Sequence, residues 1–440
     1  MKAAAHVRLR LTFEPRSRPP FRADVLLLVL CLLTAAVPVR AEAPGPEAQN
    51  PPPPNPAASA GGGTEEEVPP WKFEARLSAS LNYDDNLFIR PADTKGDLYG
   101  QIAPTLAVGM GDFRSELASF APIPHFLAQT GEEELPRQDF AYASYTPDLL
   151  LFSKYHSQDT VNHDARLAAR QENDLWNFQG QFHFQHETQP NIDVGRRITQ
   201  TDYTADANAA YVISGKLTGG TELYGNRTEY SGGLASTDGR ITGYLDYQVA
   251  PKTALGVGIA GGYLDVASGA NQAYEQSLLQ IKYAPTEKLS FAGQAGAEYR
   301  QYDSSLGNRT HFIFDASGSY QATDSTLFTL TDKRETLASA EYSGEDIIAS
   351  TYEGGIRQRF LQSLYLTLSG GYVHDTYENN RPVIVVARHD DYYFYGVSAA
   401  RDISQHGTIQ LSYEHRRNDS SLANFKFTDN LVGVAVAILF

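Results

Sequence analysis

The chain ends in LVGVAVAILF, residues 431–440, in which two sets of side chains alternate. Successive side chains of an extended strand point to opposite faces. One face of this run therefore carries Val432, Val434, Val436, Ile438 and Phe440. The other face carries Leu431, Gly433, Ala435, Ala437 and Leu439. The pattern predicts a terminal β-strand that is apolar on both faces and closes on an aromatic residue.

The same period of two recurs along the chain. In FEARLSASLNY, residues 73–83, the odd positions are apolar and the even positions polar or charged, with an aromatic residue at each end. Eleven residues suit a tilted strand that crosses a bilayer, which takes roughly 9–11, and the aromatic ends suit the two interfacial girdles. Windows 176–185, 240–249 and 289–300 alternate in the same way, and none has helical spacing. The terminal run is also similar to the strand signal that the outer-membrane assembly machinery recognises.

About eighteen such runs can be placed between residues 71 and 440. Short connections alternate with longer ones, as periplasmic turns alternate with external loops in outer-membrane barrels. The sequence therefore predicts an all-β, transmembrane, antiparallel up-and-down barrel of about 18 strands. The runs lie near 73–83, 98–110, 139–156, 161–171, 174–187, 200–213, 216–229, 237–249, 253–266, 272–284, 288–301, 309–322, 325–337, 346–360, 363–377, 389–402, 406–417 and 427–440.

Three features fit this pattern less well. Residues 112–138 form a long stretch where the alternation places a periplasmic turn, and we expect a short helix or a segment folded into the lumen. Pro104 and Pro147 lie inside the second and third runs, where each removes a backbone donor. A soluble sandwich or propeller is the rival fold, and the mean hydropathy of −0.36 would suit it. Its strands average about 5–6 residues, so the longer runs favour the membrane barrel.

The first 70 residues differ from the rest. Residues 25–33, VLLLVLCLL, follow five arginines and precede small residues, and the run is shorter than the roughly 20 residues of a spanning helix. We interpret residues 1–41 as a secretory signal peptide rather than a membrane anchor. Its Cys31 is the only cysteine, so the mature chain has no disulfide. Residues 42–70 hold nine of the 23 prolines and predict a disordered periplasmic linker.

The charge excludes one class of partner. The formal net charge is −16, and removal of the basic residues 1–41 makes the mature chain more negative still. Nucleic-acid binding requires a basic surface. The sequence therefore predicts no nucleic-acid partner.

Four motifs carry a family resemblance: YDDNLF at 83–88, IAPTL at 102–106, RQRFL at 357–361 and LTLSGGY at 366–372. On these motifs, residues 71–440 resemble the putative β-barrel porin 2 family. The resemblance implies an outer-membrane barrel, often encoded near exopolysaccharide or capsule genes. It implies no agreed substrate and no catalytic residues.

Alternation assigns a set of charged residues to the lumen. A charge that faces lipid near the membrane centre costs roughly 2–4 kcal/mol, so charged residues are expected inside. Two interpretations stay open: a wetted channel whose charges tune selectivity, or structural filling by cross-strand ion pairs. Mixed signs argue against strong ion selectivity. The predicted pore-lining residues, after Glu74 and Arg76 of the first strand, are Arg166, Arg170, Asp206, Glu222, Arg240, Asp246, Lys282, Glu298, Arg300, Asp315, Glu353, Arg357, Arg359, Glu414 and Arg416.

Catalytic and metal-binding sets are weak. His374-Asp375, His389-Asp390-Asp391 and Asp84-Asp85 fall at predicted strand tips or in loops, and nothing selects a nucleophile. Asp84-Asp85-Asn86 could supply oxygens to Ca²⁺, but turn composition favours a plain turn. We expect no enzyme activity, no cofactor and no metal.

Two functions follow as expectations. The first is a passive porin for small hydrophilic solutes such as sugars. The second is exopolysaccharide or capsule export, or surface attachment, with residues 42–70 meeting a periplasmic partner. In either case we expect contacts with outer-membrane lipids, with lipopolysaccharide and, through the terminal strand, with the assembly machinery.

Overall fold

The computed structural model describes residues 71–111, 139–267, 271–303, 307–342, 344–379 and 387–440. The predicted signal peptide, the linker and the segment 112–138 lie outside these residues. In the described part, helical structure consists of two short 3-10 turns, η1 (His156–Gln158) and η2 (Ala423–Phe425). No described helix has the length and apolar character needed to cross a membrane.

Eighteen strands form one sheet, in which every neighbouring pair is antiparallel. The strands are β1 (Lys72–Asp84), β2 (Asp97–Met110), β3 (Phe140–Phe152), β4 (Thr160–Glu172), β5 (Trp176–Asn191), β6 (Arg196–Ser214), β7 (Leu217–Tyr230), β8 (Ser236–Ala250), β9 (Thr253–Val266), β10 (Gln272–Thr286), β11 (Leu289–Tyr302), β12 (Arg309–Thr323), β13 (Thr326–Ala338), β14 (Glu345–Phe360), β15 (Leu364–Asn379), β16 (His389–Ser404), β17 (Gly407–Ser420) and β18 (Phe427–Leu439).

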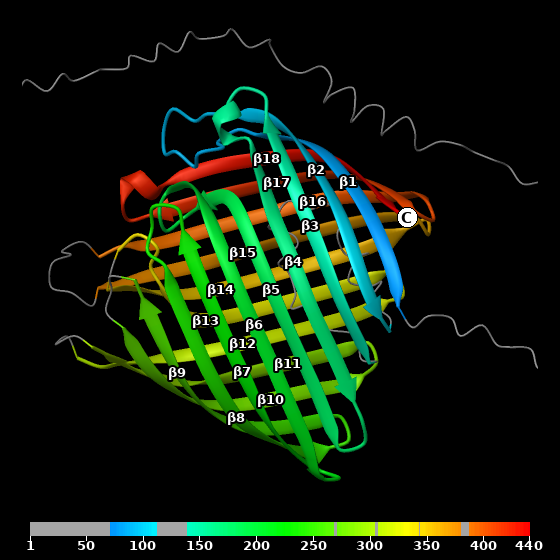
Figure 1. Ribbon diagram of the computed structural model, residues 1–440, viewed down its shortest axis with the longest axis vertical. Coiled ribbons are helices and arrows are strands. Elements are labelled where there is room, and N and C mark those ends of the chain that lie inside the picture. Colours follow the sequence, from blue (N-terminus) through cyan, green and yellow to red (C-terminus); the bar gives the residue numbers. More distant parts are fainter. Residues whose placement is uncertain (1–70, 112–138, 268–270, 304–306, 343, 380–386) are drawn as a thin grey trace, which may run out of the picture. The chain divides into compact units, whose positions relative to one another are not determined.

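The sheet closes on itself because the first strand pairs with the last. The β1–β18 register runs from Arg76↔Leu439 to Asp84↔Leu431, and the Phe440 N–H donates to the Ala75 carbonyl at 2.8 Å. Figure 1 shows the end of the chain beside β1. A closed ring has no free edge strand. The predicted barrel and its strand number are confirmed.

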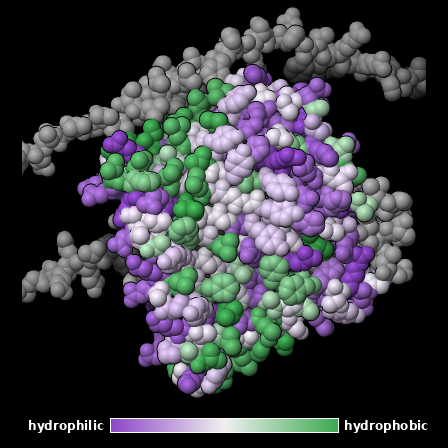
Figure 2. Space-filling model, turned by 180° about the vertical axis from the view of Figure 1, so that it is seen from behind, coloured by the Kyte–Doolittle hydropathy of each residue, from purple (hydrophilic) through white to green (hydrophobic). Residues whose placement is uncertain are grey.

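The two faces of the wall differ as the alternation predicts. On β9 and β10 the outward Ile259 and Leu279 are 72% and 69% exposed, whereas their neighbours Ala260 and Leu278 are buried. On the face seen in Figure 2, hydrophobic side chains gather in patches on the outer wall. Exposed apolar side chains of this kind form the lipid-facing band of a membrane barrel.

Short turns join the strands at one end of the barrel, which we call the turn end, and longer loops at the other, the loop end. One loop is shorter than predicted. Residues 188–199 were expected to be a loop, but β5 and β6 stay paired to Asn191↔Arg196, which leaves only 192–195. The Thr188 and Thr199 hydroxyls, 2.9 Å apart, join the two strands in this extension.

The two prolines inside predicted strands lie opposite each other. Pairing between β2 and β3 stops at Ile102↔Leu149 and resumes at Leu106↔Tyr145, so Pro104 and Pro147 fall in the gap. Proline has no N–H to donate to the ladder. A hydrogen bond between the Thr105 and Thr146 hydroxyls, at 2.8 Å, joins the strands there. The prediction of strands at these positions is confirmed, with a local break in their pairing.

Candidate functional site

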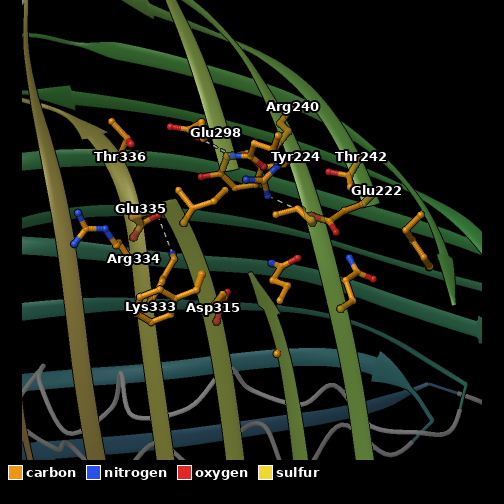
Figure 3. Close-up of a pocket in the computed structure, with 18 of the residues that line it drawn as sticks. Glu222, Tyr224, Arg240, Thr242, Glu298, Asp315, Lys333, Arg334, Glu335 and Thr336 are labelled. Atoms are coloured by element: carbon orange, nitrogen blue, oxygen red, sulfur yellow. Dashed lines mark hydrogen bonds and ion pairs between the residues drawn. The ribbon is translucent and has the colours of Figure 1, made fainter. Parts of the chain in front are cut away.

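Inner faces of strands β6 to β8 and β10 to β13 line a cavity of about 500 Å³. Polar and charged side chains dominate its lining, because alternate residues of each strand point inward. Figure 3 shows side chains from neighbouring strands pointing into this space. Seven of the fifteen predicted pore-lining residues meet there: Asp206, Glu222, Arg240, Lys282, Glu298, Arg300 and Asp315.

Basic side chains of this wall are paired with acids. The nitrogen–oxygen distances are 3.4 Å for Arg240–Glu222, 2.7 Å for Lys282–Asp246 and 2.5 Å for Arg300–Glu298. Each of the three cations also lies over a tyrosine ring: Arg240 over Tyr224, Lys282 over Tyr244 and Arg300 over Tyr274. These contacts fix the side chains against the wall.

Glycines on the partner strands make room for two of these rings. Gly220 pairs with Tyr244 and Gly262 with Tyr274. A Cβ atom at Gly220 would lie 2.3 Å from the Tyr244 ring, and one at Gly262 would lie 2.2 Å from the Tyr274 ring. An aromatic ring laid over a cross-strand glycine is a known way to hold register and curvature in a sheet.

The other predicted residues lie on the inner wall away from this cavity. Arg166 pairs with Asp164 and Arg170 with Glu172 on β4. Arg357 lies over the Tyr365 ring, and Arg359 donates to the Asp324 carbonyl. Glu353 lies on β14. Ion pairing and open space therefore occur in the same lumen, and neither interpretation of the charges excludes the other.

Glu414 and Arg416 lie at the closing seam, beside the YDDNLF motif. Arg416 contacts Asp429, Asp84 and Glu414. Asn86, fully buried, accepts from the Arg90 N–H and donates to the carbonyls of Arg90 and Thr428. The motif therefore forms the corner that joins β1 to β18.

The only carboxylate group with the spacing of a cation site, among the described residues, is Asp84, Asp85 and Asp429. Their oxygens lie within 4.8 Å of one another. Asp84 accepts from the Asn86 N–H at 2.8 Å, and Asp85 accepts from the main chain and side chain of Asn430 at 2.8 and 2.6 Å. These contacts support the turn interpretation of the motif.

The loop end of the β13–β14 hairpin lies inside the ring. The β13–β14 register is unbroken from Thr326↔Gln358 to Ala338↔Asp346, so Asp346 shares a face with the outward Tyr352. Yet Asp346 is 1% exposed and accepts from Gln272 Nε2 at 2.6 Å and from the Tyr302 hydroxyl at 2.7 Å. Those side chains belong to the inner faces of β10 and β11. Asp346 belongs to the outward face of β14, so it can contact the inner faces of β10 and β11 only if this end of β14 lies within the barrel.

Burial supports the same placement. Six consecutive residues, from Glu345 to Ser350, are buried, although neighbouring residues of a wall strand alternate between lumen and lipid. The Thr336 carbonyl on β13 also accepts from Arg300 on β11, at 3.2 Å. The hairpin thus covers the loop end of the cavity, and Thr336 and Leu337 contribute to the cavity lining.

The tip of the hairpin, residues 339–342, reaches two loops that lie eight and six strands away around the ring of eighteen. The Ala340 N–H donates to the Asp193 carboxylate at 2.6 Å, and the Ala340 carbonyl accepts from Leu234 N–H at 2.8 Å. Asp193 belongs to the β5–β6 connection and Leu234 to the β7–β8 connection. Val194 and Ile198 form a buried apolar cluster with Ala340. The hairpin therefore spans the bore.

Arg388, which precedes β16, fixes the Asp193 loop in place. Its guanidinium donates to the carbonyls of Ile192 and Asp193 at 2.8 and 2.7 Å and lies between the rings of Tyr377 and Phe425. An ion pair of 3.7 Å joins Arg388 to the Asp193 carboxylate. Burial raises the pKa of the Asp193 carboxyl group, although the Ala340 N–H and the Arg388 charge oppose that shift.

Sequence reasoning placed Asp193 and Arg388 in loops and assigned neither a role. Their contact joins residues 195 positions apart. No local pattern marks such a pair, since both positions look like solvated loop residues.

Residues 286–440 match the model of the family described as Putative beta-barrel porin 2. The chain is an outer-membrane, porin-like barrel. The predicted resemblance is thus confirmed, and the match covers the part of the barrel from the end of β10 to the C-terminus. Among curated proteins, the porin-like barrel has no match.

Three solved structures are among those similar to the porin-like barrel. OccK2 of Pseudomonas aeruginosa, crystallised with glucuronate, is 11% identical with a TM-score of 0.43, over 84% of this chain and 98% of that one. OccK11 of the same organism is 10% identical with a TM-score of 0.39, over 84% and 96%. OccAB3 of Acinetobacter baumannii is 8% identical with a TM-score of 0.42, over 84% and 99%. Likenesses of this distance do not bear on the solute.

Proposed function

We propose that the protein is a passive channel through which small hydrophilic solutes cross the outer membrane. The observation that carries this proposal is the closed ring of eighteen strands with a charged, polar inner wall around a cavity of about 500 Å³. A ring of this strand number is wide enough to enclose an aqueous lumen. Carboxylates, guanidinium groups and tyrosine hydroxyls on the wall can replace water around a hydroxylated solute.

The hairpin β13–β14 limits the size of that solute. It crosses the bore at the loop end, so a solute that enters there must pass beside the hairpin. A small sugar suits this geometry better than a polymer chain. The hairpin therefore favours the porin interpretation over polysaccharide export, and the porin family favours a channel over an enzyme.

Conductance in planar bilayers tests the proposal. We expect the refolded barrel to produce discrete opening events in KCl, and proteoliposomes containing it to swell faster in a monosaccharide than in a trisaccharide of equal osmolarity. A folded barrel, verified by its heat-dependent gel mobility, that neither conducts nor admits any sugar would contradict a channel.

A gene deletion separates the two functions. Loss of the barrel should slow uptake of small solutes and leave secreted exopolysaccharide unchanged. A loss of exopolysaccharide with unchanged solute uptake would support export instead.

A further inference from the structure

The β13–β14 hairpin is separated from the wall on one side at its loop end. Pairing between β12 and β13 begins at Thr323↔Thr326 and stops at Phe314↔Arg334. Pairing between β13 and β14 continues to Ala338↔Asp346, and between β14 and β15 to Glu345↔Asn379. The sheet therefore splits between β12 and β13, and the loop-end part of β12 pairs with β11 alone.

Side chains cover this split. Arg334 Nε donates to the Phe312 carbonyl at 3.1 Å, and Arg309 forms an ion pair with Glu378 of β15. The β12 backbone from Arg309 to Ile313 thus offers an edge to which the end of β13 could pair. An unpaired strand edge is a ready template for another strand. The backbone N–H and carbonyl groups of the hairpin can form hydrogen bonds in two positions. One position lies across the bore, and the other lies against β12.

The contacts of the tip favour the position across the bore. Asp193 makes the polar part of that attachment, since its carboxylate accepts from the Ala340 N–H and, at 3.1 Å, from the Ser339 hydroxyl. The side chain of Asp193 is 11% exposed, and Arg388 is 3% exposed. Hydrogen bonds to a buried carboxylate are stronger than those between neutral groups.

We infer that Asp193 is a positioning residue that holds the β13–β14 hairpin across the bore, and that release of the hairpin from Asp193 opens the channel. This inference rests on the proposed channel function and adds its regulation. The two positions of the hairpin form a two-state equilibrium, and a side chain that contacts only one of the two states sets their populations.

The first test is Asp193→Ala in planar bilayers. Loss of the carboxylate removes the acceptor for Ala340 and Ser339, and we expect the open fraction to rise at least about tenfold, because even one lost hydrogen bond to a charged group has an effect of that size. Asp159→Ala is the matched control, because Asp159 also lies in a loop and accepts a backbone N–H, that of Phe152 at 2.8 Å. Asp159 does not contact the hairpin, so its variant should conduct as the wild type does.

The second test fixes the hairpin covalently. The variant Val194→Cys with Ala340→Cys places two thiols within one buried cluster, and Cys31 is the only native cysteine. We expect the oxidised variant to remain at its lowest conductance, and reduction to restore the openings. Single-cysteine variants control for the substitutions themselves and should respond to neither treatment.

The outcomes separate the two proposals. A wild-type barrel that never conducts contradicts the channel function. A wild-type barrel that conducts, with Asp193→Ala unchanged and the oxidised cysteine variant still opening, overturns the role of Asp193 alone. If Asp193→Ala does not fold, as judged by heat-dependent mobility, the cysteine pair decides, because that variant keeps Asp193 and the backbone N–H of residue 340 from which it accepts.

Discussion

Gly262 and Tyr274 illustrate how single residues hold the wall. Replacement of Gly262 by alanine would place a Cβ atom 2.2 Å from the Tyr274 ring. The ring cannot move freely, because its hydroxyl donates to Asp238 at 2.8 Å and Arg300 lies over its face. We expect Gly262→Ala to lower the free energy of unfolding by about 1–3 kcal/mol, the usual range for overpacking. Urea denaturation in lipid vesicles measures the change.

Gly261 provides the control for that substitution. It is the neighbour of Gly262 and belongs to the opposite face, and a Cβ atom there meets no atom within 4 Å. Gly261→Ala should leave the stability unchanged. Equal losses of stability in the two variants would mean that the flexibility of the glycine backbone, rather than the contact with Tyr274, is the reason for glycine at position 262.

The β13–β14 hairpin depends on Asp346 for its contact with β10 and β11. Replacement by alanine would leave Gln272 Nε2 and the Tyr302 hydroxyl without this acceptor, and an unsatisfied buried donor costs about 1–3 kcal/mol. We expect Asp346→Ala to loosen the hairpin, seen as faster protease cleavage within 339–342. Asp346→Asn keeps one acceptor oxygen and should restore part of the protection.

Asp332 on the same hairpin is the matched control. It lies in the part of β13 that is still paired with β12, opposite Ala316. Asp332→Ala should leave the cleavage rate within 339–342 unchanged. Faster cleavage in both variants would show that the hairpin responds to any loss of charge.

Closure of the whole barrel depends on β18, which Phe440 follows directly. Phe440 is 72% exposed. Its backbone N–H donates to the Ala75 carbonyl and so attaches the residue to the wall. The exposed side chain is free to be recognised, as the predicted contact with the assembly machinery requires. We expect Phe440→Ala to reduce the amount of barrel in the outer membrane several-fold, as measured by membrane fractionation.

The same variant should refold in detergent with the stability of the wild type, because the strand pairing is unchanged. A Phe440→Ala barrel that assembles normally in cells would contradict the role of the terminal signal. A variant that also fails to refold would assign Phe440 to the stability of the barrel rather than to its recognition.

The period of two, the eighteen runs and the alternating connection lengths could be derived from the sequence because each is local. A strand's inward and outward residues follow from its own register, and a slip of one residue would turn every charge toward lipid. For the same reason the inner positions of Glu222, Arg240 and Glu298 could be predicted. The sequence also predicted that Pro104 and Pro147 lie within strands. The gap in backbone pairing at these two prolines could not be predicted, because it depends on the register between β2 and β3.

The inward course of the β13–β14 hairpin was decided by the tertiary structure alone. Residues 346–360 alternate like those of any wall strand. The pattern does not show whether their outward side chains contact lipid or the inner faces of β10 and β11. The contacts that turn the hairpin inward join Asp346 to Gln272 and Asp193 to Ala340, 74 and 147 positions apart. Such contacts depend on ring closure, which brings distant strands to face each other across one lumen. The sequence alone therefore determined the barrel, and the constriction within it required the folded ring.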